Sequence, residues 1–298
     1  MKKHLSIIYI IIAGLCWGII GLFSKKLATL GLNAIQITEM RCIITAVSLL
    51  SFTIIFDRNK LKISIKDIWI FLGTGILSIA FFNICYFNAI EYSNLSSAAI
   101  LLYTAPFFVL IISSFIFKEK LTIRKIIALI ISFIGCILAV GMADAAESIT
   151  TKGLIFGLLS GFGYGLYSIF GRIALKKYHT LTVTTYTFIT ASIFLLPFCE
   201  INDLTQNICA EKEIIIFSLL LGTISTLVPF ILYTKGLSLT DPGTASIIAY
   251  FEPLVATMCG LIVFKEKTTF LKVTGIILIF ISIIILNYKK KVKEKIYK

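Results

Sequence analysis

Long apolar stretches recur along the whole chain. Eight of them contain no Asp, Glu, Lys or Arg, and two more are interrupted only by Glu39 with Arg41 and by Glu252. In order the ten stretches are 5–24, 27–56, 68–90, 92–117, 126–143, 153–171, 180–199, 214–234, 242–264 and 273–288. A helix needs about 20 such residues to cross a bilayer. Backbone amides in lipid must be bonded internally, and strand-like alternation is missing, so we predict ten transmembrane helices.

The same motif is written twice, 147 residues apart. Residues 98–138 and 245–285 align without a gap, and the offset also relates the first span to the sixth. The matched pairs include Gly14 with Gly161, Trp17 with Tyr164, Tyr103 with Tyr250, Pro106 with Pro253, and Phe117-Lys118-Glu119-Lys120 with Phe264-Lys265-Glu266-Lys267. We therefore predict two five-helix repeats, 1–147 and 148–298, the second carrying a basic tail. Five is odd, so the copies must lie upside down relative to each other. The predicted fold is an all-α integral membrane protein with a 5+5 inverted-topology repeat, an architecture typical of secondary transporters.

Composition and charge agree with a membrane protein. The chain is 58% hydrophobic and 14% charged, whereas soluble domains are about half apolar and about a quarter charged. The net charge of +13 suggests nucleic acid at first, but much of the excess lies in the tail after the last span, where anionic lipid attracts it. Placing both termini in the cytoplasm puts 20 of the 28 Lys and Arg residues inside and 7 outside, with Arg41 in a span. This bias predicts that orientation. The basic start resembles a signal peptide, but the apolar run predicts an uncleaved first helix.

These features together resemble the drug/metabolite transporter superfamily, specifically its ten-helix EamA branch. The resemblance rests on Gly14-Leu-Cys-Trp17-Gly18 followed by Lys25, on Arg41 in the second span, and on the proline followed by a Lys-Glu-Lys turn that ends each half's fourth span. It implies a secondary carrier, usually an exporter of small metabolites or amino acids. It does not imply a particular substrate. The halves also differ chemically, because Arg41 and Glu252 match Phe188 and Ala105.

Charges inside spans are expensive, so they usually face a cavity or a partner. Arg41 lies about 10 Å deep at 1.5 Å per residue, and Glu252 lies near the middle of the ninth span. If the second and ninth spans meet, the two could touch, as a substrate-binding or proton-coupled pair or as a structural salt bridge. Arg41 could also snorkel outward. Glu39 is shallower and points away from Arg41, so we expect an interfacial charge.

Proline and tyrosine twins mark the middle of the fourth and ninth spans. Pro106 and Pro253 each remove one backbone bond, which predicts either hinges with freed carbonyls or plain kinks. Tyr103 and Tyr250 lie one turn earlier and are expected to line a cavity or to meet a hydrogen-bond partner. Four weaker pathway candidates lie on other spans, and for the last of them packing is the favoured alternative: Asn83, Tyr86, Tyr233 and Trp17.

Small-residue faces and turn charges complete the candidates. Gly14 with Gly18, and Gly157 with Gly161 and Gly165, predict close helix contacts. Glu119 and Glu266 are expected to be boundary charges at tight turns, with gating as an alternative.

The chain lacks the patterns of other membrane functions. It has two histidines, no HExxH, no G-x-S-x-G and no CxxC, so we predict no enzyme activity, no metal and no cofactor. An enzyme, a channel or a non-transporting scaffold are the alternatives. The expected partners are a small-molecule substrate and membrane lipid, without nucleic acid, and a homodimer is left open. The Lys- and Ile-rich composition suggests a bacterial plasma membrane. The sequence does not identify the substrate, the direction of transport or the coupling ion.

Overall fold

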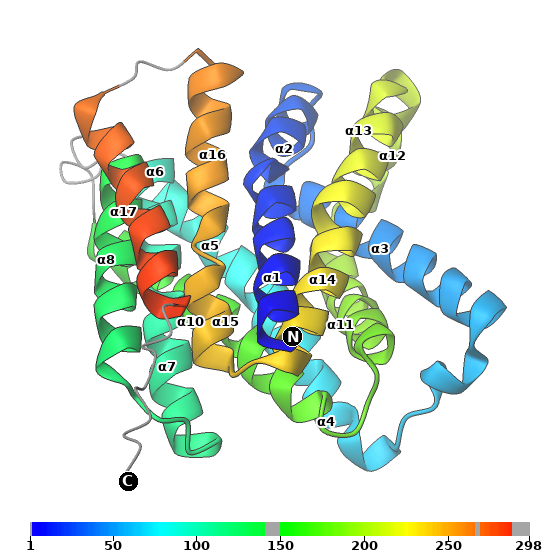
Figure 1. Ribbon diagram of the computed structural model, residues 1–298. Helices are drawn as coiled ribbons and strands as arrows, with labels where there is room; N and C mark the ends of the chain where they lie inside the picture. Colours follow the sequence, from blue (N-terminus) through cyan, green and yellow to red (C-terminus); the bar gives the residue numbers. More distant parts are fainter. Residues whose placement is uncertain (1, 141–149, 266–268, 288–298) are drawn as a thin grey trace, which may run out of the picture.

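The computed structural model describes residues 2–140, 150–265 and 269–287. These residues form a bundle of helices, and no strand occurs among them (Figure 1). Ten helical stretches of the described chain are long and apolar enough to cross a membrane, which confirms the predicted number and the all-α class. They are His4–Thr29, Ala34–Phe56, Ile65–Glu91, Leu95–Ile116, Ile123–Val140, Thr151–Ala174, Thr180–Phe198, Glu213–Leu239, Pro242–Ile262 and Phe270–Asn287.

Several of these spans consist of more than one helix. The first half comprises α1 (Lys2–Gly18), α2 (Ile20–Thr29), α3 (Ala34–Phe56), two 3₁₀ turns (Arg58–Leu61 and Ile65–Asp67), α4 (Ile68–Leu72), a π-helical segment (Gly73–Ala80), α5 (Phe81–Glu91), α6 (Leu95–Leu102), α7 (Ala105–Ile116) and α8 (Ile123–Val140). The second half comprises α10 (Thr151–Ala174), α11 (Thr180–Leu195), a 3₁₀ turn (Leu196–Phe198), α12 (Ile201–Ala210), α13 (Glu213–Gly222), a π-helical segment (Thr223–Leu227), α14 (Val228–Leu239), α15 (Pro242–Ile248), α16 (Phe251–Ile262) and α17 (Phe270–Asn287).

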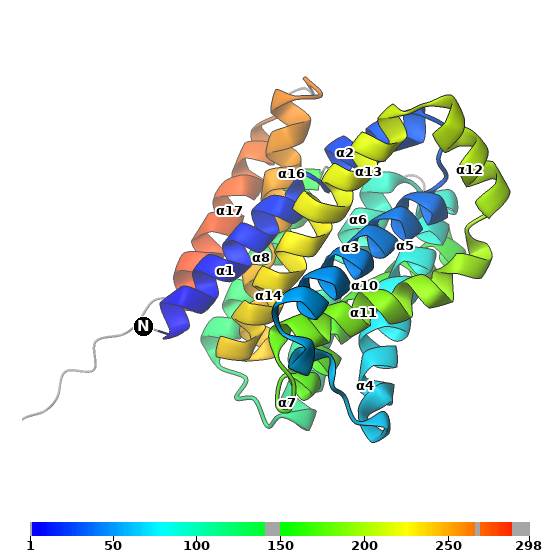
Figure 2. The ribbon, with the colours of Figure 1, turned by 90° about the vertical axis from the view of Figure 1, so that its right-hand side faces the viewer.

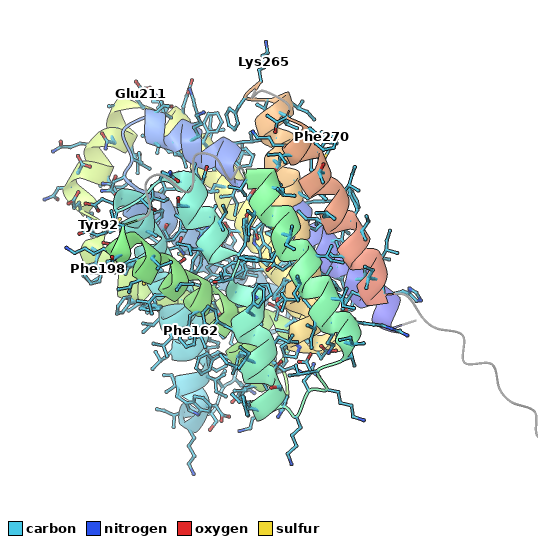
Figure 3. The ribbon with its side chains drawn as sticks, turned by 90° about the vertical axis from the view of Figure 1, so that its left-hand side faces the viewer. Tyr92, Phe162, Phe198, Glu211, Lys265 and Phe270 are labelled. Carbon is cyan, nitrogen blue, oxygen red and sulfur yellow. The ribbon has the colours of Figure 1, made fainter. Side chains whose placement is uncertain are left out.

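The duplication in the sequence recurs in local structure. Helix α17 begins and ends 147 residues after α8. The turns before these two helices also match. Lys118 (φ 54°) precedes α8, Lys265 (φ 52°) precedes α17, and the two residues are twins at the same offset. Figure 1 shows the α7–α8 turn and the C-terminal end of α16 at opposite ends of the bundle, and Figure 3 places Lys265 at the second of these ends.

Helix starts follow their capping residues. The side chain of Asn94 accepts a hydrogen bond from the Ser97 amide at the start of α6, and its twin Asp241 accepts one from the Thr244 amide at the start of α15. Such caps satisfy backbone donors that have no partner within the helix. The fourth span of each half therefore begins with the same kind of side-chain cap.

The two halves interlock through glycines. A side chain at Gly14 or Gly18 would meet α16, because an added Cβ would lie 3.1 Å from Phe251 Cβ or 2.4 Å from Val255 Cβ. The twin face on α10 packs against the first half: a Cβ on Gly161 would lie 2.8 Å from the Leu101 carbonyl oxygen. Helix α1 of the first half thus lies beside α14 and α16 of the second (Figure 2).

Candidate functional site

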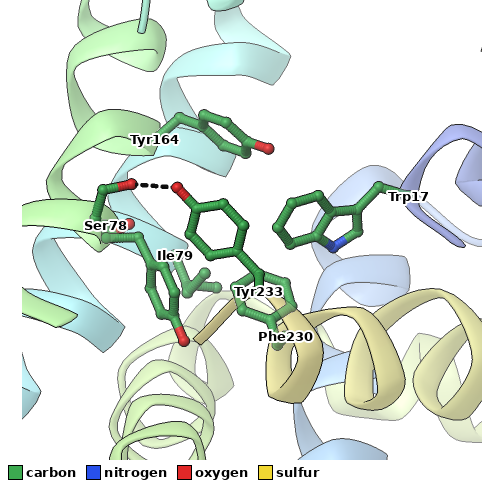
Figure 4. Close-up of a pocket in the computed structure, with 8 residues that line it drawn as sticks. Trp17, Ser78, Ile79, Tyr164, Phe230 and Tyr233 are labelled. Atoms are coloured by element: carbon green, nitrogen blue, oxygen red, sulfur yellow. Dashed lines mark hydrogen bonds between the residues drawn. The ribbon is translucent and has the colours of Figure 1, made fainter. Parts of the chain in front are cut away.

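A cluster of aromatic side chains surrounds one cavity between α1, α10, α14 and the first π-helical segment (Figure 4). Trp17 is central: its ring centroid lies 5.2 Å from those of Phe230 and Tyr233 and 6.4 Å from that of Tyr164. In this structure the cavity is small, with room for about one water molecule. The lining is Trp17, Ser78, Ile79, Tyr164, Tyr167, Ser168, Phe230 and Tyr233.

Polar groups in this cavity are mostly paired. The hydroxyls of Ser168 and Tyr233 lie 2.7 Å apart, and those of Tyr167 and Thr234 lie 2.5 Å apart. Ser78 differs, because its buried hydroxyl has no hydrogen-bond partner among the described residues. A buried donor without a partner costs about 1–3 kcal/mol. The cavity therefore offers one hydroxyl to a water molecule or a solute.

A second cavity lies next to the first and is shared between the halves. Its lining is Leu102, Tyr103, Ala105, Pro106, Tyr164, Ser246, Ala249, Tyr250 and Glu252, and in this structure it has room for about one water molecule at most. Tyr164 lines both cavities, and its hydroxyl donates a hydrogen bond of 2.9 Å to the half-buried Glu252 carboxylate. One tyrosine thus connects the aromatic cavity to the acidic group.

The two halves contact each other directly at Tyr103 and Tyr250, where the helices of the twin spans are interrupted. The Tyr250 hydroxyl donates a 2.6 Å hydrogen bond to the Tyr103 carbonyl oxygen. That oxygen is available because α6 ends at Leu102 and the Phe107 amide bonds to Thr104 instead. The carbonyl freed by the break is therefore occupied by a protein group in this structure.

The two prolines lie in the first turns of helices rather than inside a continuous helix. Pro106 is the second residue of α7, and Pro253 is the third residue of α16. Amides in the first turn of a helix have no intrahelical partner, so a proline costs little there. Each twin span is broken just before its proline, and a hinge at the break stays a prediction.

Arg41 and Glu252 do not form an ion pair in the described part of the chain. The buried Arg41 guanidinium instead donates a 3.2 Å hydrogen bond from Nη2 to the Asn83 amide oxygen, and its Nε has no partner in the part of the chain that the structure describes. Helix α3, which carries Arg41, packs on α5 and α11, and α16 lies elsewhere in the bundle. The second and ninth spans therefore do not bring these charges into direct contact here, and Arg41 does not snorkel outward.

Glu39 is more enclosed than an interfacial charge. It lies near the start of α3, as expected, but its side chain is fully buried. Ser192 of α11 donates a hydrogen bond to one carboxylate oxygen, while the other has no partner. Helix α11 packs on α3 and covers the Glu39 side chain. The sequence of α3 alone does not predict which helix lies there.

The structure gathers most of the predicted pathway residues around the two cavities. Trp17, Tyr233, Tyr103, Tyr250, Pro106 and Glu252 line them. Asn83 supports Arg41, and Tyr86 packs against the core without lining either cavity. Sequence reasoning missed Tyr164, Tyr167 and Ser78 as cavity residues. Tyr164 could have been found, because it is the repeat twin of Trp17. No group of three His, Cys, Asp or Glu side chains suited to a metal occurs among the described residues.

Comparisons with known proteins agree with this architecture. The model of the EamA-like transporter family matches twice, at residues 4–141 and 151–288. An uncharacterized transporter of Archaeoglobus fulgidus is 26% identical over 92% of this chain and 95% of its own length. An uncharacterized transporter of Clostridium kluyveri is 25% identical over 98% and 95%.

Two further matches bear on the location and the fold. The uncharacterized inner membrane transporter YicL of Salmonella typhimurium is 24% identical over 93% of each chain. A crystal structure that shares 14% identity superimposes with a TM-score of 0.79 over 96% of this chain and 97% of its own, which shows a common fold. With its ten apolar helices and two family matches, this multi-pass membrane protein belongs to the EamA-like transporter family.

Proposed function

We propose that the protein is a secondary active transporter that exports small metabolites or amino acids across the bacterial plasma membrane by alternating access. The single observation that carries this proposal is the second cavity. It lies between the halves, it is lined by residues of α6, α7, α10, α15 and α16, and it exposes the Glu252 carboxylate. A site between two repeats suits a carrier, because rocking of the halves exposes it to each side in turn.

The inverted repeat and the orientation belong to the same proposal. The two Lys-Glu-Lys turns start at the same offset in each half, and the turn residues Lys118 and Lys265 share a left-handed backbone. The ends that carry them lie on opposite sides of the bundle (Figure 1). Both termini and the α7–α8 turn lie in the cytoplasm in this proposal, with the Lys265 end outside.

Arg41 and Glu252 take different roles in the proposed mechanism. Glu252 lines the cavity and, among the described residues, accepts a side-chain hydrogen bond from Tyr164. It is the candidate carrier of a proton, or the group that holds a cationic part of the substrate. Arg41 is held by Asn83 and keeps its Nε unpaired, so an anionic group of a substrate could reach it after a rearrangement of α3 or α5.

A comparison of cells and medium tests the proposal. Metabolites are quantified inside and outside bacteria that overproduce the protein, and in bacteria that overproduce Glu252→Gln at matched membrane levels. We expect at least one small solute to accumulate in the medium with the native chain and to fall to background with the variant. Equal metabolite profiles for the native chain, the variant and cells without the protein would overturn the proposal. A new chemical product without net movement of a solute would favour an enzyme.

A further inference from the structure

An ion cluster outside the two cavities joins the halves at the α7–α8 end of the bundle. Lys125 Nζ lies 2.5 Å from Glu119 Oε1 and 2.8 Å from Asp241 Oδ1. Glu119 and Lys125 belong to the first half, and Asp241 precedes α15 in the second. The side chains of Glu119 and Lys125 are only 5% and 13% exposed, while that of Asp241 is 39% exposed. Water therefore screens this contact less than it screens a surface ion pair.

The backbone of the second half takes part in the same cluster. Glu119 Oε2 accepts a 3.2 Å hydrogen bond from the Gly243 amide, and Asp241 accepts one of 2.8 Å from the Thr244 amide. Gly243 packs closely against this cluster: an added Cβ would lie 2.5 Å from Glu119 Oε1 and 2.6 Å from Leu110 Cδ1, so these side chains would have to shift. The N-terminal end of α15 is thus fastened to α7 and α8 by charge, by amides and by close packing.

The two carboxyl groups respond differently to this environment. Burial and the neighbouring Asp241 carboxyl raise the pKa of Glu119 above its ordinary value. Burial acts to raise the pKa of Asp241 too, but hydrogen bonds with Glu119, Lys125 and Thr244 outweigh it and lower that pKa. Asp241 therefore stays ionised and keeps its bond to Lys125 as the pH falls, while Glu119 is protonated first.

At the opposite end of the bundle, Glu266, the equivalent of Glu119, lies outside the described residues, so only the described helices are compared. Helix α15 packs on α7 and α8. By the 147-residue offset the equivalent contacts would join α6 to α16 and α17, and these helices do not form a comparable contact surface. The position of Asp241 is taken there by the neutral Asn94. The described contacts of α15 with α7 and α8 thus have no counterpart of the same extent between α6 and the helices α16 and α17, although α8 and α17 pack on each other.

We propose that Glu119, Lys125 and Asp241 form a gate that holds the α7–α8 end of the transport pathway closed and separates when that end opens. The gate lies one helical turn from the cavity, because Ser246 of α15 lines the second cavity while Gly243 binds Glu119. Movement of α15 away from α7 would uncover the cavity from this end. The gate itself does not depend on the proposed function. Only one further expectation, that α6 closes on α16 when the gate opens, rests on the proposed alternating access.

Accessibility of Ser246 tests the gate without knowledge of the substrate. Ser246→Cys is introduced into the full chain after replacement of the seven native cysteines, and a membrane-impermeant maleimide is applied from the α7–α8 side of membrane vesicles. We expect slow labelling with the gate intact and roughly tenfold faster labelling with Asp241→Asn, since a lost charge-assisted bond shifts the closed population by about that factor. Asparagine caps a helix as well as aspartate does, so α15 keeps its start.

Two variants keep this test falsifiable. Lys125→Met removes the shared cation and should accelerate labelling by the same roughly tenfold factor. Lys177→Met is the matched control, because it breaks another ion pair between the halves, the 2.8 Å bond to Asp67, without touching α7 or α15. It should leave the rate unchanged. Equal rates in all variants, or acceleration by Lys177→Met alone, would overturn the gate.

A cysteine pair between α6 and α16 tests alternating access independently of the gate. Ser96 and Thr257 are the repeat twins of Gly243 and Leu110. If α6 closes on α16 when the gate opens, a Ser96→Cys/Thr257→Cys pair should cross-link about tenfold faster in the Asp241→Asn background. Faster labelling of Ser246→Cys without faster cross-linking would support the gate and overturn alternating access. Rapid cross-linking with the gate intact would contradict the separation of α6 and α16.

Discussion

Replacing Gly18 by alanine tests the contact that locks the halves together. The added Cβ would lie 2.4 Å from Val255 Cβ and 2.9 Å from the Glu252 carbonyl oxygen. Neither atom can rotate away, because one is a backbone oxygen and the other is attached directly to the backbone. Carbon atoms prefer about 3.5–4.0 Å, so α1 must move from α16 by roughly 1 Å.

The size of the effect follows from two opposing terms. Overpacking a close contact costs about 1–3 kcal/mol, and the fixed neighbours favour the upper part of that range. Alanine also has a higher helix propensity than glycine, which stabilises the helix by up to about 1 kcal/mol. The expected net loss is about 2 kcal/mol, which lowers the Tm by roughly 4–8 °C at about 2–4 °C per kcal/mol.

A thermal stability assay of the detergent-purified protein measures this loss, and the chain offers a matched control. Gly21 lies one turn further along the same span, and nothing lies within 4 Å of its added Cβ. Gly21→Ala should therefore leave the Tm unchanged or raise it. If Gly18→Ala melts at the same temperature as Gly21→Ala, or higher, the interlocking contact does not exist as described.

Three further predictions test the site, the first with a control substitution. Tyr250→Phe removes the hydroxyl that donates to the Tyr103 carbonyl oxygen and should lower the unfolding free energy by about 1 kcal/mol. Tyr103→Phe keeps that backbone acceptor and should lower it less. A denaturant titration that ranks the two variants the other way would contradict the hydrogen bond. Glu252→Gln should abolish export or flatten its dependence on pH, as measured by substrate flux across a pH series, and a native profile would exclude proton coupling through this group. Arg41→Ala should reduce flux at an unchanged membrane level, measured by quantitative immunoblot, and undiminished flux would make Arg41 structural.

Much of the architecture was accessible from the sequence because lipid imposes simple rules. The apolar runs gave the ten spans, and the fixed offset related helices whose bounds then matched, such as α8 and α17. The same offset placed Tyr103 beside Pro106 in one half and Tyr250 beside Pro253 in the other. Periodicity did not predict where a span is interrupted. The break at Ile19 between α1 and α2 and the π-helical segments depend on the neighbours of each helix.

The contacts of the charged residues were the least predictable part. Arg41 and Glu252 are opposite charges at similar depth, and an ion pair was a reasonable expectation. The actual partners, Asn83 and Tyr164, are fixed by which helices are adjacent, and a single sequence does not contain that information. Twin positions would have been a better guide, because Trp17 lines the first cavity and its equivalent, Tyr164, does too, although the sequence analysis did not select Tyr164.

The glycine contact between α1 and α16 also constrains how the protein is made. Gly18 meets its partner Val255 only after another 237 residues have been synthesised. At about 5–20 residues per second a ribosome needs roughly 12–47 s for that length. During this interval the first helix must wait in the bilayer with its small-residue face against lipid, so the native assembly completes only when the last spans have been inserted.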